Sequence, residues 1–163
     1  MMLKTTKMDV WAAPIDDAPG GLAKLLRALA DHGVDLDSLL ARREGAMKGK
    51  GVVFLAPRHG GAELHRLEET GLHAASHTAT LKIEGEDRPG LGAELVRVIA
   101  DAGVNLHGLT ANVIGHKFVC YASFDSVADL ERADKALQTV DTERFPRLRA
   151  AMRRAMRDRA VTH

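Results

Sequence analysis

The feature that most constrains this chain is an internal repeat. Placing residues 17–36 against residues 87–106 gives eleven identities in twenty positions without a gap. Average composition would give roughly one or two. The repeat therefore indicates a duplicated unit, and the 163 residues are expected to form two small modules of one fold. In the first copy the identical residues are Asp17, Pro19, Gly20, Ala23, Leu25, Arg27, Ala30, Asp31, Gly33, Val34 and Leu36.

The second copy has the clearer pattern of elements. Residues 77–83 alternate between polar and apolar side chains, which is the period of a half-buried strand. Pro89 suits the first turn of a helix, apolar residues follow at helical spacing, and Gly103 ends the helix. The following residues predict strands at 104–113 and 118–122, the latter central, and a helix at 127–137. Residues 138–140 are a weak candidate for a fourth strand.

The first copy repeats this plan. It predicts strands at 8–13, 34–42 and 52–55, helices at 19–32 and 62–70, and a polar hairpin at 44–50. Residues 71–76 lead into a fourth strand or directly into the second module. Strand–helix–strand twice per copy predicts an α+β fold of two ferredoxin-like βαββαβ modules, with antiparallel sheets and helices on one face. The expected division is 7–76, 77–141 and a basic amphipathic C-terminal helix or tail at 142–163.

An acidic residue, then x-Pro-Gly, then an apolar helix and Gly-Val-Asn, resembles the ACT domain family. The stretch that carries the resemblance is residues 87–105, and the match is looser in the first copy. The resemblance implies a βαββαβ fold that binds amino acids at interfaces between modules, and that regulates assembly or a partner. The tandem arrangement resembles small bacterial ACT-only proteins and, in architecture only, repressors of the glycine cleavage system type. A homodimer is the assembly expected for such a chain.

The same resemblance points to ligand positions. Serine-binding ACT modules use an asparagine two residues before the proline, another in Gly-Val-Asn, and a histidine two residues before the first. These positions hold Asp87, Asn105 and Gly85 here, so one matches, one has become an acid and one is lost. The first copy has Asp17 and Asp35 there, with no amide, so the second copy is expected to be the better site.

The loop before each helix also has the physical properties of an anion site. A helix N-terminus presents unpaired N–H groups and partial positive charge, and glycine allows a close approach. Asp87 would face a ligand ammonium, and Asn105 would offer a donor and an acceptor. A simpler interpretation is that Asp17 and Asp87 only cap their helices and that Asn105 bonds local backbone. The expected ligand-binding positions are Asp87, Arg88, Pro89, Gly90, Leu91, Asn105, Asp17, Gly20, Gly21 and Asp35.

Other classes of function find no support in the sequence. Cys120 is the only cysteine and lies in an apolar strand, where a core thiol is expected rather than a nucleophile. The eight histidines show no metal-ligand spacing, and no phosphate-binding or nucleophile motif occurs. No signal peptide or membrane span is evident, so a cytoplasmic protein without catalytic residues, metal or cofactor is expected.

The C-terminal stretch has a charge pattern of its own. Residues 143–160 contain seven arginines and two acids, with an apolar stripe at helical spacing. The favoured interpretation is a helix that docks on the body or on a sister subunit, and the alternative is a contact for an acidic protein partner, nucleic acid or a membrane surface. Nucleic acid is not expected, because aromatic residues for base stacking are scarce. At the level of function, two alternatives stay open beside amino-acid sensing: a ligand-free interaction module and a transcriptional accessory.

Overall fold

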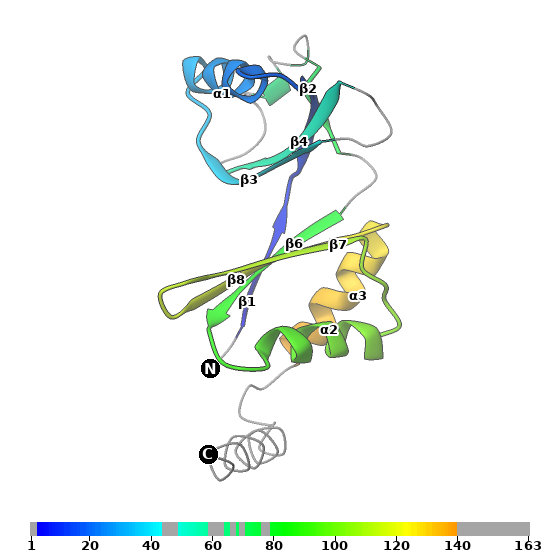
Figure 1. The fold of residues 1–163 in the computed structure, drawn as a ribbon. Helices are drawn as coiled ribbons and strands as arrows, with labels where there is room; N and C mark the ends of the chain where they lie inside the picture. Colours follow the sequence, from blue (N-terminus) through cyan, green and yellow to red (C-terminus); the bar gives the residue numbers. More distant parts are fainter. Residues whose placement is uncertain are drawn as a thin grey trace.

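The computed structural model describes residues 3–43, 49–58, 64–65, 68, 71–75 and 79–139. These residues form two four-stranded antiparallel sheets, one in the upper and one in the lower half of Figure 1. The elements in chain order are β1 (Lys4–Met8), β2 (Trp11–Asp16), α1 (Gly21–Asp31), β3 (Leu36–Arg43), β4 (Lys50–Pro57), β5 (His73–Ala74), β6 (Ala79–Glu86), α2 (Leu91–Asp101), β7 (Gly108–Ile114), β8 (Lys117–Phe124) and α3 (Val127–Gln138).

The first module contains the sheet β3-β4-β2-β5 and helix α1. Its fourth position, beside β2, is taken by β5, which has only two residues. The helix expected at 62–70 falls mostly outside the described residues. The expected boundaries at 76/77 and 141/142, and the tail at 142–163, lie there as well.

The second module contains the sheet β1-β6-β8-β7 and helices α2 and α3. Its fourth position is occupied by β1, the first strand of the whole chain, which pairs with β6 from Lys4↔Glu84 to Met8↔Thr80. The single strand predicted at 8–13 is therefore wrong, since the chain forms two strands there and they enter different sheets. The weak strand candidate at 138–140 is also wrong over its described residues, because α3 continues to Gln138.

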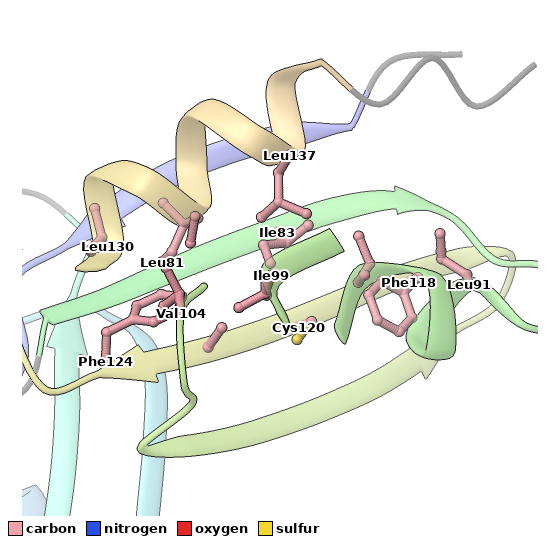
Figure 2. Packing of buried hydrophobic residues seen from close by; sticks show 13 residues of the cluster. Leu81, Ile83, Leu91, Ile99, Val104, Phe118, Cys120, Phe124, Leu130 and Leu137 are labelled. Carbon is pink, nitrogen blue, oxygen red and sulfur yellow. The ribbon is translucent and has the colours of Figure 1, made fainter. Parts of the chain in front are cut away.

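Each module has its own hydrophobic core between its sheet and its helices. In the second module, Leu81 and Ile83 of β6 and Phe124 of β8 pack against α2 and α3, as Figure 2 shows. In the first module, Trp11 and Val53 pack against α1. Thirteen buried residues make up the second core and eight the first, counted over the described residues. The two βαββαβ modules therefore do not share one core.

The helix-free faces of the two sheets face each other. In Figure 1, α1 lies on the far side of the upper sheet, and α2 and α3 lie on the far side of the lower one. Side chains alternate along a strand, so Thr80 and Ala56 point away from their own helices. Both are nonetheless buried, and Lys82 of the lower sheet bonds to Asp37 of the upper one, so the two faces are in contact. We call the space between these two faces the seam.

Candidate functional site

The two glycine turns predicted from the repeat have one geometry. The Gly21 N–H donates to the Ala18 carbonyl, and the Leu91 N–H donates to the Arg88 carbonyl. Gly20 has φ 91° and ψ −12°, and Gly90 has φ 88° and ψ −5°. These are the angles of the third residue of a type II turn, where glycine is required and proline precedes it. The Pro-Gly pair thus forms the turn before each helix, rather than the first helical turn.

The expectation that Asp17 and Asp87 cap the helices is wrong. The N-cap residues are Gly20 and Gly90, and neither helix has a side-chain cap bond. The Asp17 carboxylate instead accepts from Arg43 Nε at 2.9 Å. Asp87 is exposed, and its backbone N–H donates to the His116 carbonyl at 2.8 Å. The type II turn explains the difference, because it places glycine, and not the acid, next to the helix.

The two turns differ in what surrounds them. A Cβ on Gly21 would lie 2.2 Å from the Asp16 carbonyl oxygen, so α1 starts in close contact with β2. The repeat places Leu91 at the matching position, and Leu91 is buried in the second core. Pro89 is exposed beside it. The duplicated turn therefore carries two different kinds of packing.

The second turn is spanned by an ion pair. Arg88 Nη1 donates to Glu94 Oε1 at 2.9 Å, and a second bond joins the same two side chains. Glu94 is only 7% exposed, which is unusual for a carboxylate without such a partner. The bond to Glu94 raises the pKa of Arg88 against the opposing effect of burial. Arg88 is thus already engaged within its own module, and the first copy has Ala18 and Lys24 in these positions.

The structure does not bring all the expected ligand positions together within one module. Gly90 precedes α2 and the exposed Asn105 follows it, and α2 has eleven residues between them. At 1.5 Å per residue that helix separates the two ends by about 16 Å. In the first module Asp35, at the far end of α1, pairs with Arg58 at 3.2 Å. One ligand of amino-acid size does not reach both ends of either helix.

A charged cleft opens in the seam, at positions that the sequence analysis did not select. Lys82 Nζ of β6 lies 2.9 Å and 3.1 Å from the two carboxylate oxygens of Asp37 of β3, and 3.5 Å from Glu84. Tyr121 Oη donates to the Asp37 carbonyl at 3.3 Å. Together these contacts join the two modules through one residue of the first. The cleft has a volume of about 290 Å³, and Lys4, Lys7 and Arg58 also line it.

Asp37 reaches the other module because β3 is irregular at this point. The register of β3 against β4 shifts between Leu36 and Ser38, which leaves Asp37 without a partner in the ladder. Such bulges turn a side chain away from the regular alternation. Burial opposes the charged form of Lys82, but the hydrogen bond and charge of Asp37, with Glu84, outweigh it and raise its pKa. The ammonium is therefore held in its charged form inside the seam.

A second cavity of about 280 Å³ lies elsewhere in the seam and is less polar. Leu40, Arg42 and Phe54 form its wall on the first module. Its wall on the second module includes Thr110 and Asn112. The only sequence signal for either seam site was the polar residues that alternate with apolar ones along the strands. This alternation does not show whether the polar face contacts water or another part of the protein.

The described residues contain no group of three or more His, Cys, Asp or Glu that could hold a metal ion. None of their helices is long and apolar enough to span a bilayer. Cys120 is buried in the second core, and burial raises the pKa of its thiol to about 11. A thiol in this state is a poor nucleophile near neutral pH.

Comparison with known proteins gives likeness of fold. No protein-family model matches the chain, and no curated protein matches its sequence. A protein of Bacteroides thetaiotaomicron is similar with a TM-score of 0.65 and 12% identity, over 83% of this chain and 99% of that one. The ligand-free regulatory subunit of aspartate kinase from Thermus thermophilus is similar with a TM-score of 0.56 and 20% identity, over 83% and 97%.

Aspartate kinase from Synechocystis is similar with a TM-score of 0.56 and 21% identity, but the match covers only 26% of that enzyme and 83% of this chain. A glycine cleavage system transcriptional repressor reaches a TM-score of 0.36, which supports no conclusion about this chain. At these identities the likeness shows the fold alone. The fold expected from the ACT resemblance, two modules in tandem, is confirmed.

Proposed function

We propose that this chain is a regulatory protein that senses an amino acid at the interface of its two modules. The protein would be a cytoplasmic homodimer. Binding of the amino acid would alter this assembly or the contact of the protein with a partner. The observation that carries the proposal is the charged cleft of the seam, where Lys82 of one module meets Asp37 of the other. The likeness in fold to regulatory subunits of aspartate kinase supports a regulatory role.

The cleft has the charges that a zwitterion requires. Lys4 and Arg58 line it as cations for a carboxylate, while Asp9 and Glu84 line it as anions for an ammonium. Because the cleft is lined from both modules, a ligand in it binds best at one relative placement of the two sheets. Differential affinity for two placements is what allows a ligand to shift a conformational equilibrium. We also propose the turns at Gly20 and Gly90 as ligand positions, to which a second copy of the chain would contribute residues.

Thermal unfolding of the full chain against each of the twenty amino acids tests this function. At a hundredfold excess over Kd, a ligand of the folded state adds about 2.7 kcal/mol. For a chain of this size that raises Tm by roughly 5–10 °C. If none of the twenty raises Tm at millimolar concentration, the proposal is wrong.

A matched pair of variants locates the effect. Asp37→Asn removes the charge that crosses the seam, and it is expected to weaken the active amino acid about tenfold or more. Asp31→Asn removes an equal charge from an exposed pair with Arg27 at 3.2 Å on α1, and it is expected to leave the affinity unchanged. Because the comparison uses the shift that ligand causes in each variant, a change in stability of the free protein does not affect it. Equal affinities in the two variants would exclude the charged cleft.

A further inference from the structure

The less polar cavity of the seam has two unlike walls. On the first module, Leu40 and Phe54 are cross-strand partners on the helix-free face of β3 and β4. Leu40 remains 47% exposed although the opposite module stands over this face. Uncovered aliphatic surface of this kind is a favourable contact for an apolar ligand. The first module therefore supplies an apolar floor.

The opposite wall is polar but carries few charges. Thr110, Asn112 and Tyr121 line it from β7 and β8, together with the hydroxyl pair Thr80 and Ser123 at 3.1 Å. These groups donate or accept hydrogen bonds without imposing a net charge. His107 also lines the cavity, with Nδ1 2.7 Å from the carboxylate of Asp125, which is not one of the lining residues. The second module thus offers neutral hydrogen-bonding groups.

One strong cation lies on the apolar wall. The guanidinium carbon of Arg42 lies 5.7 Å from the ring centroid of Phe54, within the range of a cation–π contact. None of the described residues that line this cavity is an aspartate or a glutamate. Its electrostatic preference is therefore for an anion, and the planar guanidinium matches a carboxylate in a bidentate geometry. An ammonium group would find no counter-charge on the walls.

We propose that this cavity is a second ligand site, for a small carboxylic acid with an apolar body and no ammonium group. The carboxylate binds Arg42, the apolar body lies on Leu40 and Phe54, and any further oxygen meets Asn112 or Thr110. The volume of about 280 Å³ equals that of roughly nine water molecules at ~30 Å³ each, which suits a ligand of about ten heavy atoms. The site differs from the charged cleft in both residues and ligand class, so it does not depend on the amino-acid site.

The test uses three compounds of one shape on the full chain: phenylacetate, phenylacetamide and 2-phenylethylamine. They present an anion, a neutral amide and a cation on the same ring. Phenylacetate is expected to shift the backbone amide resonances of Arg42, Phe54 and Asn112, and to bind at least tenfold more tightly than the other two. No binding of phenylacetate at 10 mM, equal binding of the amide, or shifts confined to other parts of the chain would overturn the site.

Neighbouring arginines supply the matched control. Arg42→Gln is expected to weaken phenylacetate at least tenfold, and Arg42→Lys to recover part of the affinity. Arg43→Gln alters the next residue, whose side chain points to the other face and pairs with Asp17, and is expected to change nothing. Equal affinities of R42Q and R43Q would overturn the role of Arg42, and the wild-type comparison of the three compounds decides even if R42Q does not fold. If D37N loses amino-acid binding but keeps phenylacetate binding, the two sites bind their ligands independently.

Discussion

The two modules arose from one sequence, yet they complete their sheets in different ways. In the first module the fourth position is filled by β5, two residues that follow the third strand in the same copy. In the second module it is filled by β1, five residues from the beginning of the chain. The second copy needs no fourth strand of its own, which explains why residues 138–139 continue or end a helix. A duplicated sequence can thus keep a fold while exchanging the segment that closes it.

The exchange is supported by side chains as well as by the strand ladder. Thr5 Oγ1 donates to Asp134 of α3 at 2.6 Å, and Lys7 Nζ lies 3.2 Å from Glu131 of the same helix. Leu3 packs against the second core. Residues 3–8 therefore belong to the second module in space, although they precede the first module in sequence.

Removing residues 1–9 is expected to have the largest effect. The second sheet would lose β1 and about five ladder hydrogen bonds at ~1 kcal/mol each, so the free energy of unfolding should fall by about 5 kcal/mol. Hydrogen exchange should accelerate in β6, which becomes an edge strand, and in α3, which loses its contacts with the side chains of β1. Faster exchange in β3 and β4 with β6 unchanged would contradict the assignment of β1 to the second module.

Two matched core substitutions come next. Leu25 and Leu95 occupy the same repeat position, and they are 7% and 3% exposed. Replacing either by alanine is expected to cost about 2–5 kcal/mol, because a buried leucine leaves a cavity. Leu95→Ala should cost more, since its core is larger and it is the more buried. Denaturant unfolding of the two variants measures the difference, and a greater loss for Leu25→Ala would reverse this ranking of the cores.

Glycine-to-alanine substitutions at the start of the two helices should change the stability in opposite directions. Gly21→Ala places a Cβ 2.2 Å from the Asp16 carbonyl, so α1 must shift, and a loss of about 2 kcal/mol is expected. Gly92→Ala in the second module meets no atom within 4 Å and replaces a helical glycine. It should stabilise by about 0.5–1 kcal/mol. Thermal unfolding distinguishes the two, and a loss of stability in both would mean that α2 approaches its sheet as closely as α1 does.

The smallest expected effect is measured on the unsubstituted protein, through the thiol of Cys120. Cys120 reports on the second core alone, and its pKa of about 11 lies above the usual 9.0. At pH 8 the thiolate fraction should be about a hundredfold below that of an ordinary thiol. Because the folded pKa is raised, the unfolded chain ionises first as the pH rises above 9, so stability should decrease between about pH 9 and 11. Alkylation of the native protein that is as fast as that of the urea-unfolded protein would contradict the burial.

The sequence predicted the fold well where the pattern was local. The alternation in β6 and the helical spacing in α2 each lie within a few residues, and together with the repeat they predict two βαββαβ modules correctly. The exchange of β1 could not be predicted, because Lys-Thr-Thr-Lys-Met carries little apolar pattern and its partner is 72 to 80 residues away. A motif that is read locally does not show which sheet a strand enters.

The candidate sites followed the same division. The glycine turns were found because Pro-Gly is a local signal, although the turn type and the absence of an aspartate cap were not foreseen. Asp37 and Lys82 were missed, since a polar residue on a strand usually faces water. Only the stacking of two helix-free faces turns these residues toward each other. The irregular register at Asp37 is likewise a tertiary feature with no sequence mark.

The exchanged strand has a consequence for synthesis on the ribosome. β1 leaves the exit tunnel first, but its partner β6 follows some 72 residues later, after the whole first module. At ~5–20 residues per second, β1 waits about 4–14 seconds without a partner. Its two lysines, Lys4 and Lys7, discourage pairing with a wrong strand during that time, as charged side chains do on exposed edges. The nascent chain must therefore keep β1 available until β6, some 72 residues later, has been made.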